Sequence, residues 1–250
     1  MIPKIIHYCW FGGKDKPKDV RLCIDSWKKY LPEYKIIEWN ENNFDVDNSN
    51  QYVKEAYKNK KWAFVSDYVR LLALYEHGGL YFDTDVEVFK PFDELLNNNC
   101  FFGFETKDYV ASAVIGCEAG HELIKIFLQS YEKRRFIKED GSFDITTNVI
   151  ILTDLLKTYG IKPNGKYQKL RENITIFPQY YFSSNDLINI FGKYDKRIYA
   201  YHHCLASWYS YNTNRNGKSE QIRHYFVGKL RNILGRNIIN NIRIIKKKRE

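Results

Sequence analysis

The sequence lacks a long apolar run. Among its 250 residues, no stretch approaches the 18 consecutive apolar residues that a membrane-spanning helix needs. The first apolar run contains Lys4 and His7 and turns at Gly12 and Gly13, so we expect neither a secretory signal nor a membrane span there. A chain of this length can bury one sizeable core, and we expect one α/β domain rather than two full domains.

The sequence also lacks paired cysteines. It has five cysteines, widely spaced and without a C-x-x-C pair: Cys9, Cys23, Cys100, Cys117 and Cys204. This spacing argues against a disulfide framework and against a zinc cluster. We therefore expect reduced, mostly buried thiols and a cytoplasmic protein.

The body of the chain has no excess charge. The net charge is +9, and the residues from Arg215 onward contribute eleven Lys or Arg and two Asp or Glu, which leaves 28 basic and 28 acidic residues in 1–214. In 213–250, apolar residues recur at three- and four-residue steps with basic residues between them. This pattern predicts a basic amphipathic helix that lies on an anionic membrane surface; the alternative is a helix packed on the domain with a solvated basic face. The sequence has no basic patch interleaved with aromatic residues, so we expect no nucleic-acid partner.

The amino-terminal part has the periodicity of a βαβ unit. We predict strands at 4–10 and 34–39 with a helix at 19–30 between them, which favours a parallel sheet. Further helices are expected at 51–59, 62–77, 121–134 and 146–159, with a short one after Pro91. Further strands are expected at 80–82, 86–89, 100–105, 110–117, 174–177 and 198–202, and loops at 40–50, 135–143 and 161–169.

Two aspartates follow a short buried strand. Asp83 and Asp85 flank one residue, and in an extended segment such side chains point to the same face, so both carboxylates can bind one hard cation. The preceding apolar helix ends at Gly78 and Gly79 and leads into the strand. In open α/β sheets, ligands bind at the carboxyl ends of strands. The triplet alone is weak support for a metal site, because surface turns carry such triplets often.

The predicted helix at 62–77 carries a charged pair on an otherwise apolar segment. Asp67 and Arg70 lie three residues apart and therefore share a face. One interpretation is an ordinary surface ion pair. The other is a pair that contacts a ligand, because charges within an apolar helix need satisfied partners.

Three blocks in order resemble one enzyme family. The segments IPKIIHYCWFGG, SDYVRLLALYEHGGLYFDTD and YHHCLASW resemble glycosyltransferase family 32, and also the glucosyltransferase domain of large clostridial toxins, over residues 1 to about 210. The resemblance implies a GT-A-type, Rossmann-like fold whose mixed, mostly parallel sheet is flanked by helices. We therefore expect a catalytic domain at 1–212 and the basic amphipathic tail at 213–250.

The resemblance also implies a reaction. We expect a retaining, metal-dependent transferase that uses a nucleotide-diphosphate sugar, with a UDP-sugar favoured, and Mn²⁺ or Mg²⁺. The expected acceptor is a glycan or lipid-linked oligosaccharide of a surface polysaccharide such as a capsule, at the inner face of the cell membrane. Two alternatives are a toxin-like transferase that glycosylates a protein, and an inactive membrane-binding module of the same fold.

The family's metal ligands can be carried over to this sequence. By resemblance, Asp85 binds the ion directly and Asp83 reaches the ion or the ribose. A residue about five positions before the Trp of the third block completes the metal site, which points to His203, and Trp208 caps the diphosphate. The toxin domains have an acidic residue at the position of His203. Successive strand residues face opposite ways, so His202 and His203 are not expected to serve together.

The remaining site residues also come from the resemblance. Asp67 and Arg70 would contact the nucleotide or the donor sugar, and Trp10, with Gly12 and His7, would belong to the nucleotide-sugar-binding set, although His7 reads as a satisfied structural histidine. The predicted catalytic residues are Asp85, Asp83, Arg70 and Asn148. Asn148 would contact the donor sugar, with a helix-capping role as the alternative. Glu105 and Asp108 follow a predicted strand and are weak candidates for acceptor contacts.

Overall fold

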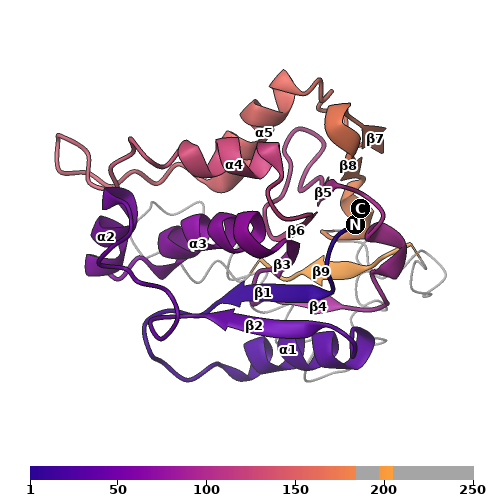
Figure 1. The fold of residues 1–250 in the computed structure, drawn as a ribbon, viewed down its shortest axis with the longest axis horizontal. Coiled ribbons are helices and arrows are strands. Elements are labelled where there is room, and N and C mark those ends of the chain that lie inside the picture. Colours follow the sequence, from indigo (N-terminus) through magenta and orange to yellow (C-terminus); the bar gives the residue numbers. More distant parts are fainter. Residues whose placement is uncertain (184–196, 205–250) are drawn as a thin grey trace, which may run out of the picture. The chain divides into compact units, whose positions relative to one another are not determined.

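The computed structural model describes residues 1–183 and 197–204 (Figure 1). Its main feature is a seven-stranded sheet with the order β2-β1-β3-β6-β5-β8-β7. The strands are β1 (Ile5–Cys9), β2 (Lys35–Trp39), β3 (Gly79–Phe82), β5 (Cys100–Gly103), β6 (Val114–Cys117), β7 (Gln168–Lys169) and β8 (Ile174–Phe177). The pairings make β2, β1, β3, β5 and β8 run in one direction, while β6 and β7 oppose them. The predicted α/β fold with a mixed, mostly parallel sheet is confirmed.

Helices cover both faces of this sheet. On one face lie α2 (Gln51–Lys58), α3 (Trp62–His77), α4 (Glu122–Gln129) and α5 (Asn148–Thr158), and α1 (Lys18–Tyr30) lies on the other (Figure 1). Short 3-10 helices occur at Asp93–Leu95, Arg171–Asn173 and Gln179–Tyr181. Side chains alternate between the faces along each strand, as in β3, where Leu80 and Phe82 pack on the α1 side and Tyr81 packs on the α3 side.

The chain enters β3 through two glycines at the end of α3. Gly78 ends the helix with φ of 62°, and Gly79 follows with φ of 106°. A Cβ on Gly79 would lie 2.6 Å from the carbonyl oxygen of Ile5 in the neighbouring strand β1. Only glycine fits this positive φ and close approach, so the predicted helix stop also sets the strand beside β1.

The segment after β3 leaves the main sheet. Val86–Val88 (β4) lies within the strand predicted at 86–89, and it pairs with β9 (Ala200–His202) in a separate antiparallel ribbon. The turn at Asp83 to Val86, closed by a hydrogen bond from the Val86 N–H to the Asp83 carbonyl at 3.0 Å, redirects the chain. Asp83 and Asp85 therefore lie at the junction between the sheet and the ribbon.

The prediction of mostly buried thiols is confirmed. Four of the five cysteines, Cys9, Cys23, Cys100 and Cys117, are buried and in no disulfide, and Cys204 is exposed. Within residues 1–183 and 197–204, the helices lack the length and apolar character that crossing a membrane requires. The predicted amphipathic helix in 213–250 lies outside the described residues.

Candidate functional site

Three parallel strands end at the same edge of the sheet and bring the predicted site residues together. Trp10 follows β1, Asn40 follows β2, and Asp83 follows β3. Because carboxyl ends of parallel strands form the ligand-binding edge in open α/β sheets, this edge is the natural position for a site.

An aspartate pair and a histidine form a cluster at this edge. One ligand atom each of Asp83, Asp85 and His202 lies within 4.8 Å of the others, and His202 Nε2 lies 3.2 Å from Asp85 Oδ1. Two carboxylates and an imidazole are suitable ligands for a divalent ion such as Mn²⁺. The three side chains are only partly buried, so an ion can reach them.

The structure brings His202, not the predicted His203, to the aspartate pair. His203 Nε2 instead lies 3.1 Å from Glu87 Oε2, and its ring packs edge-on against Tyr201. The reason is the alternation along β9. Tyr201 pairs with Glu87 and shares a face with His203, whereas His202 pairs with Val86 on the face toward the core.

Arg70 joins α3 to the first aspartate. Its Nη2 lies 2.7 Å from Asp67 Oδ1 and its Nη1 lies 3.2 Å from Asp83 Oδ1. Nη1 also donates to the carbonyl of Ser112 at 2.8 Å, and the guanidinium stacks over the Tyr81 ring at 4.6 Å. The side chain is 5% exposed. The two carboxylates raise the pKa of Arg70 above its usual range, so its charge is permanent.

Asp67 is the partner of Arg70 within the helix. Burial raises the pKa of the Asp67 carboxyl to about 6, with Arg70 opposing the shift, so the group is mostly ionised at neutral pH. Asp67, Asp83 and Asp85 then contribute three negative charges against the one positive charge of Arg70, a net charge of −2 with His202 neutral. A divalent cation matches this charge.

Asn148 contacts the backbone of Asp67 directly. It is the first residue of α5, 1% exposed, and its Nδ2 donates to the Asp67 carbonyl at 3.1 Å while its Oδ1 accepts from the Tyr131 hydroxyl. The helix cap is Thr147, so Asn148 is not the capping residue. The contact with the Asp67 carbonyl ties the start of α5 to α3.

His7 is inside the protein. It is 0% exposed, and its Nε2 lies 2.9 Å from the Gly78 carbonyl while Nδ1 accepts from Trp39 Nε1 at 3.0 Å. Burial lowers the pKa of His7 to about 4, so the ring is neutral, with the proton on Nε2. Both ring nitrogens are used by the protein. The prediction that His7 belongs to the nucleotide-sugar-binding residues is therefore corrected, because His7 has a structural role.

Trp10 and Gly12 line a pocket at the same sheet edge. The pocket has a volume of about 540 Å³ and is lined by Trp10, Gly12, Gly13, Lys14, Lys16, Glu38, Asn40, Glu41, Asn42, Tyr57 and Trp62. Gly12 has φ of 93°, and a Cβ there would lie 2.6 Å from Trp62 Nε1. Its backbone N–H donates to Glu41 Oε1 at 2.7 Å. A side chain at position 12 would thus collide with the pocket wall.

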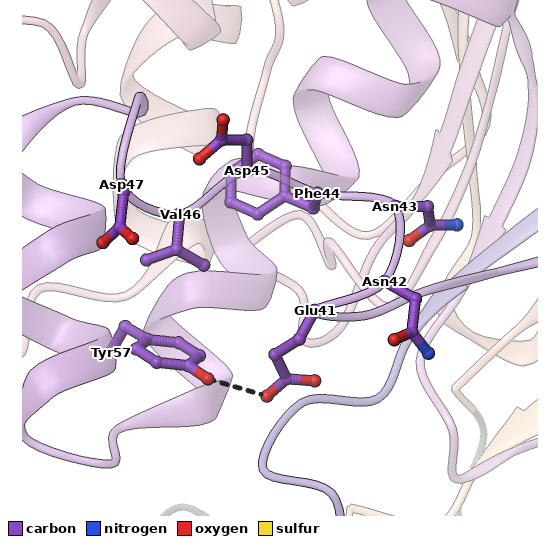
Figure 2. A pocket seen from close by; sticks show the side chains of 8 residues that line it. All are labelled: Glu41, Asn42, Asn43, Phe44, Asp45, Val46, Asp47 and Tyr57. Carbon is purple, nitrogen blue, oxygen red and sulfur yellow. Dashed lines mark hydrogen bonds between the residues drawn. The ribbon is translucent and has the colours of Figure 1, made fainter.

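A second hollow adjoins this pocket. Figure 2 shows the loop after β2 curving over Tyr57, whose hydroxyl donates to Glu41 Oε1 at 3.1 Å. The hollow has a volume of about 510 Å³ and shares Glu41, Asn42 and Tyr57 with the first. Acidic and amide side chains dominate its lining, so it favours polar or cationic groups.

Two contacts at the site were not predicted. The Tyr81 hydroxyl donates to Asp83 Oδ1 at 3.0 Å, and Ser112 supplies the carbonyl that holds Arg70. Tyr81 could have been found, since it lies two residues before Asp83 on the same strand face. Ser112 could not, because its carbonyl is a backbone atom brought close by sheet pairing. The predicted Trp208 lies outside the described residues.

Known proteins that resemble this chain are glycosyltransferases. Residues 17–102 match the family model of the glycosyltransferase sugar-binding region containing a DXD motif. Inositol phosphoceramide mannosyltransferase 3 of Schizosaccharomyces pombe is 26% identical over 129 residues, which is 49% of this chain and 35% of that protein. The chain thus spans about a third of the length of this relative. The predicted resemblance to DXD glycosyltransferases of the family 32 type is confirmed.

Two solved glycosyltransferase structures are also similar. PaToxG glycosyltransferase has 18% identity and a TM-score of 0.46, covering 63% of this chain and 69% of its own. A glycosyltransferase involved in the glycosylation of the major capsid of PBCV-1 has 12% identity and a TM-score of 0.42, covering 88% of this chain and 100% of its own.

Proposed function

We propose that this protein is a metal-dependent, retaining glycosyltransferase that takes its sugar from a nucleotide-diphosphate donor. The observation that carries the proposal is the cluster of Asp83, Asp85 and His202 beside the buried Arg70. The family match over residues 17–102, which include Arg70, Asp83 and Asp85, supports it. Mn²⁺ or Mg²⁺ held by this cluster would stabilise the negative charge that develops on the departing diphosphate.

Each part of the site has a role in this reaction. Arg70 holds a planar, permanently charged guanidinium against Asp67 and Asp83, which fixes the position of the first aspartate of the cluster. Trp10 follows β1, the neighbour of β3, and the pocket around Gly12 extends to residues after β2, so this part of the sheet edge could hold the base and ribose of a nucleotide. An aromatic ring there offers a stacking surface for the base.

The acceptor is proposed to be a glycan or lipid-linked oligosaccharide of a surface polysaccharide. The basic, amphipathic pattern of 213–250 supports action at the inner face of a membrane, with residues 1–212 as the catalytic domain. Sedimentation with vesicles of anionic lipid tests this part. The full chain should sediment at low salt and a 1–212 truncation should not; equal sedimentation of both would contradict the role of the tail.

A thermal-shift screen of nucleotide sugars tests the reaction. UDP-glucose, UDP-galactose, UDP-N-acetylglucosamine and GDP-mannose are each added with and without Mn²⁺. A ligand at 100 times its dissociation constant stabilises the folded state by about 2.7 kcal/mol, so the true donor should raise the melting temperature only with metal. Asp85→Asn should lose the shift and Asp154→Asn, on the exposed face of α5, should keep it. Absence of a shift with every donor and metal would instead support an inactive module.

A further inference from the structure

The helix α1 binds the backbone of the ribbon strand that follows the DXD aspartates. Trp27 lies on the buried face of this helix, and its indole Nε1 donates to the Val86 carbonyl at 2.7 Å. The preceding residue, Ser26, accepts a hydrogen bond from the Val88 N–H at 2.9 Å through its hydroxyl oxygen. The same hydroxyl donates to the Cys23 carbonyl, one helical turn earlier, at 2.5 Å. Two consecutive side chains of α1 therefore hold β4.

These hydrogen bonds serve the edge of β4 that faces away from β9. Among the described strands, β4 pairs with β9 alone, and the His203 N–H donates to the Asp85 carbonyl at 3.0 Å on that side. Because the backbone groups of successive residues point to opposite edges of a strand, Val86 and Val88 direct theirs toward α1. Both residues are fully buried, and buried backbone groups need partners. The α1 side chains supply one donor and one acceptor for them.

The ring of Trp27 also contacts the strand before the aspartates. Its centroid lies 5.5 Å from that of Phe82, the last residue of β3, and both rings are fully buried. Phe82 directly precedes Asp83, and Val86 directly follows Asp85. One buried side chain therefore touches both ends of the segment that carries the two aspartates.

The position of β4 determines the spacing of the candidate metal ligands. Asp83 is held from the α3 side, because Arg70 Nη1 lies 3.2 Å from its Oδ1. Asp85 is held from the ribbon side, where its Oδ1 lies 3.2 Å from His202 Nε2. A displacement of β4 would therefore move Asp85 relative to Asp83. Groups that orient metal ligands from behind contribute to the affinity of the ion.

We propose that Trp27 and Ser26 are positioning residues for the divalent cation, because they hold the start of β4 so that Asp85 and Asp83 can bind one ion. The inference rests on the metal-dependent function proposed above. Neither side chain belongs to the cluster of candidate ligands, and both act through the backbone of β4. This role depends on two specific hydrogen bonds and not on buried volume alone.

Two other residues offer matched comparisons. Trp39 is also buried, and its Nε1 donates to His7 Nδ1 at 3.0 Å, which joins β2 to β1 and leaves β4 untouched. Trp39→Phe therefore removes a buried indole hydrogen bond of the same kind. Ser130, at the end of α4, donates its hydroxyl to the Phe127 carbonyl three residues earlier at 2.6 Å, the same local bond that Ser26 makes.

Mn²⁺ binding in the presence of UDP or GDP tests the inference, with free Mn²⁺ measured by electron paramagnetic resonance. Trp27→Phe should weaken Mn²⁺ binding on the order of 10-fold, the scale of groups that orient metal ligands. Ser26→Ala should also weaken it, and Ser26→Thr, which keeps the hydroxyl, should bind as the wild type. Trp39→Phe and Ser130→Ala should stay within about twofold of the wild type, because distant sites act independently.

Urea unfolding without metal separates positioning from stability. Trp27→Phe and Trp39→Phe each lose one buried indole hydrogen bond, so both should lower the free energy of unfolding. Only Trp27→Phe should also lower the affinity for Mn²⁺. If Trp27→Phe does not fold, the two Ser26 variants test the inference by the same criterion.

Three results would overturn the inference. Mn²⁺ affinity within about twofold of the wild type in Trp27→Phe or in Ser26→Ala would exclude a positioning role for that residue. Equal weakening in Trp27→Phe and Trp39→Phe would make the effect a general loss of core packing. If the wild type binds Mn²⁺ with neither nucleotide, the proposed metal-dependent function fails, and the inference fails with it. Normal binding by the wild type with unchanged binding by the variants would remove the inference alone.

Discussion

The two sides of the Asp83–Asp85 turn hold their charges in different ways. On the α3 side, Arg70 is 5% exposed and pairs with both Asp67 and Asp83 through a charge that does not depend on pH. On the ribbon side, Asp85 and Glu87 face His202 and His203, whose side chains are 16% and 31% exposed and carry a charge only when protonated. The first side is a fixed framework, whereas the second is open to an external cation.

This difference separates stability from chemistry within one site. Removing the Arg70 charge from the α3 side leaves the partly buried carboxylates of Asp67 and Asp83 without compensation, which costs folding free energy. Removing a ligand from the ribbon side takes away an interaction with an ion and costs activity instead. Variants on the two sides should therefore differ in which measurement they change.

The largest expected effect is on the α3 side. Arg70→Met should lower the free energy of unfolding by about 3–5 kcal/mol, because Asp67 and Asp83 lose their buried partner. The matched control is Lys157→Met. Lys157 pairs with Asp154 at the same i,i+3 spacing and at 2.7 Å, but its side chain is 57% exposed.

Urea unfolding of both variants measures the contrast. Lys157→Met should change the free energy of unfolding by less than about 1 kcal/mol, as for surface pairs generally. Equal losses in the two variants would mean that burial does not distinguish the α3 side.

On the ribbon side, Asp85→Asn should reduce metal-dependent donor hydrolysis on the order of 10²–10³-fold, because it removes a ligand of the ion that stabilises the diphosphate. Its melting temperature without metal should stay close to that of the wild type, since the ladder between β4 and β9 is formed by backbone groups. Steady-state hydrolysis measures the expected loss of activity, and thermal unfolding measures the expected constancy of the melting temperature. If Asp85→Asn lost stability but kept full activity, the ribbon side would serve stability and not chemistry, which would contradict the contrast between the two sides.

A smaller effect tests the fixed framework through pH. His7 is buried beneath the end of α3, with a pKa of about 4 against about 6.5 when unfolded. The unfolded state therefore binds a proton between these values that the folded state does not, so stability is full above pH 6.5 and falls as the pH drops toward 4. The difference corresponds to about 3 kcal/mol.

His7→Leu should remove this part of the acid dependence. Urea unfolding at intervals from pH 7 to pH 4 should give a shallower decline in the variant than in the wild type. Parallel curves for the two proteins would show that His7 is not held neutral by burial.

The sequence predicted best those features that depend on local patterns. The apolar periodicity and the two glycines predicted α3 at residues 62–77, and the structure has it at Trp62–His77. A helical period and a residue that requires positive φ are both readable from neighbouring letters. The same holds for β8, predicted and found at Ile174–Phe177.

Features that depend on distant pairing were harder to predict. Whether His202 or His203 faces the aspartates depends on the register of β9 against β4, segments more than 100 residues apart. A shift of one residue exchanges the two faces of a strand. In the same way, the Asn148 amide could be recognised as polar, but its contact with the Asp67 carbonyl arises only when α5 packs on α3.

The choice between the two histidines gives the most direct test of the proposed metal site. Mn²⁺ binding in the presence of UDP, measured by isothermal titration calorimetry, is compared for the wild type, His202→Ala and His203→Ala. His202→Ala should weaken Mn²⁺ binding by about 10–100-fold, while His203→Ala, which loses the contacts with Glu87 and Tyr201, should stay within about threefold. Weaker binding in His203→Ala with normal binding in His202→Ala would contradict the ion site formed by Asp83, Asp85 and His202.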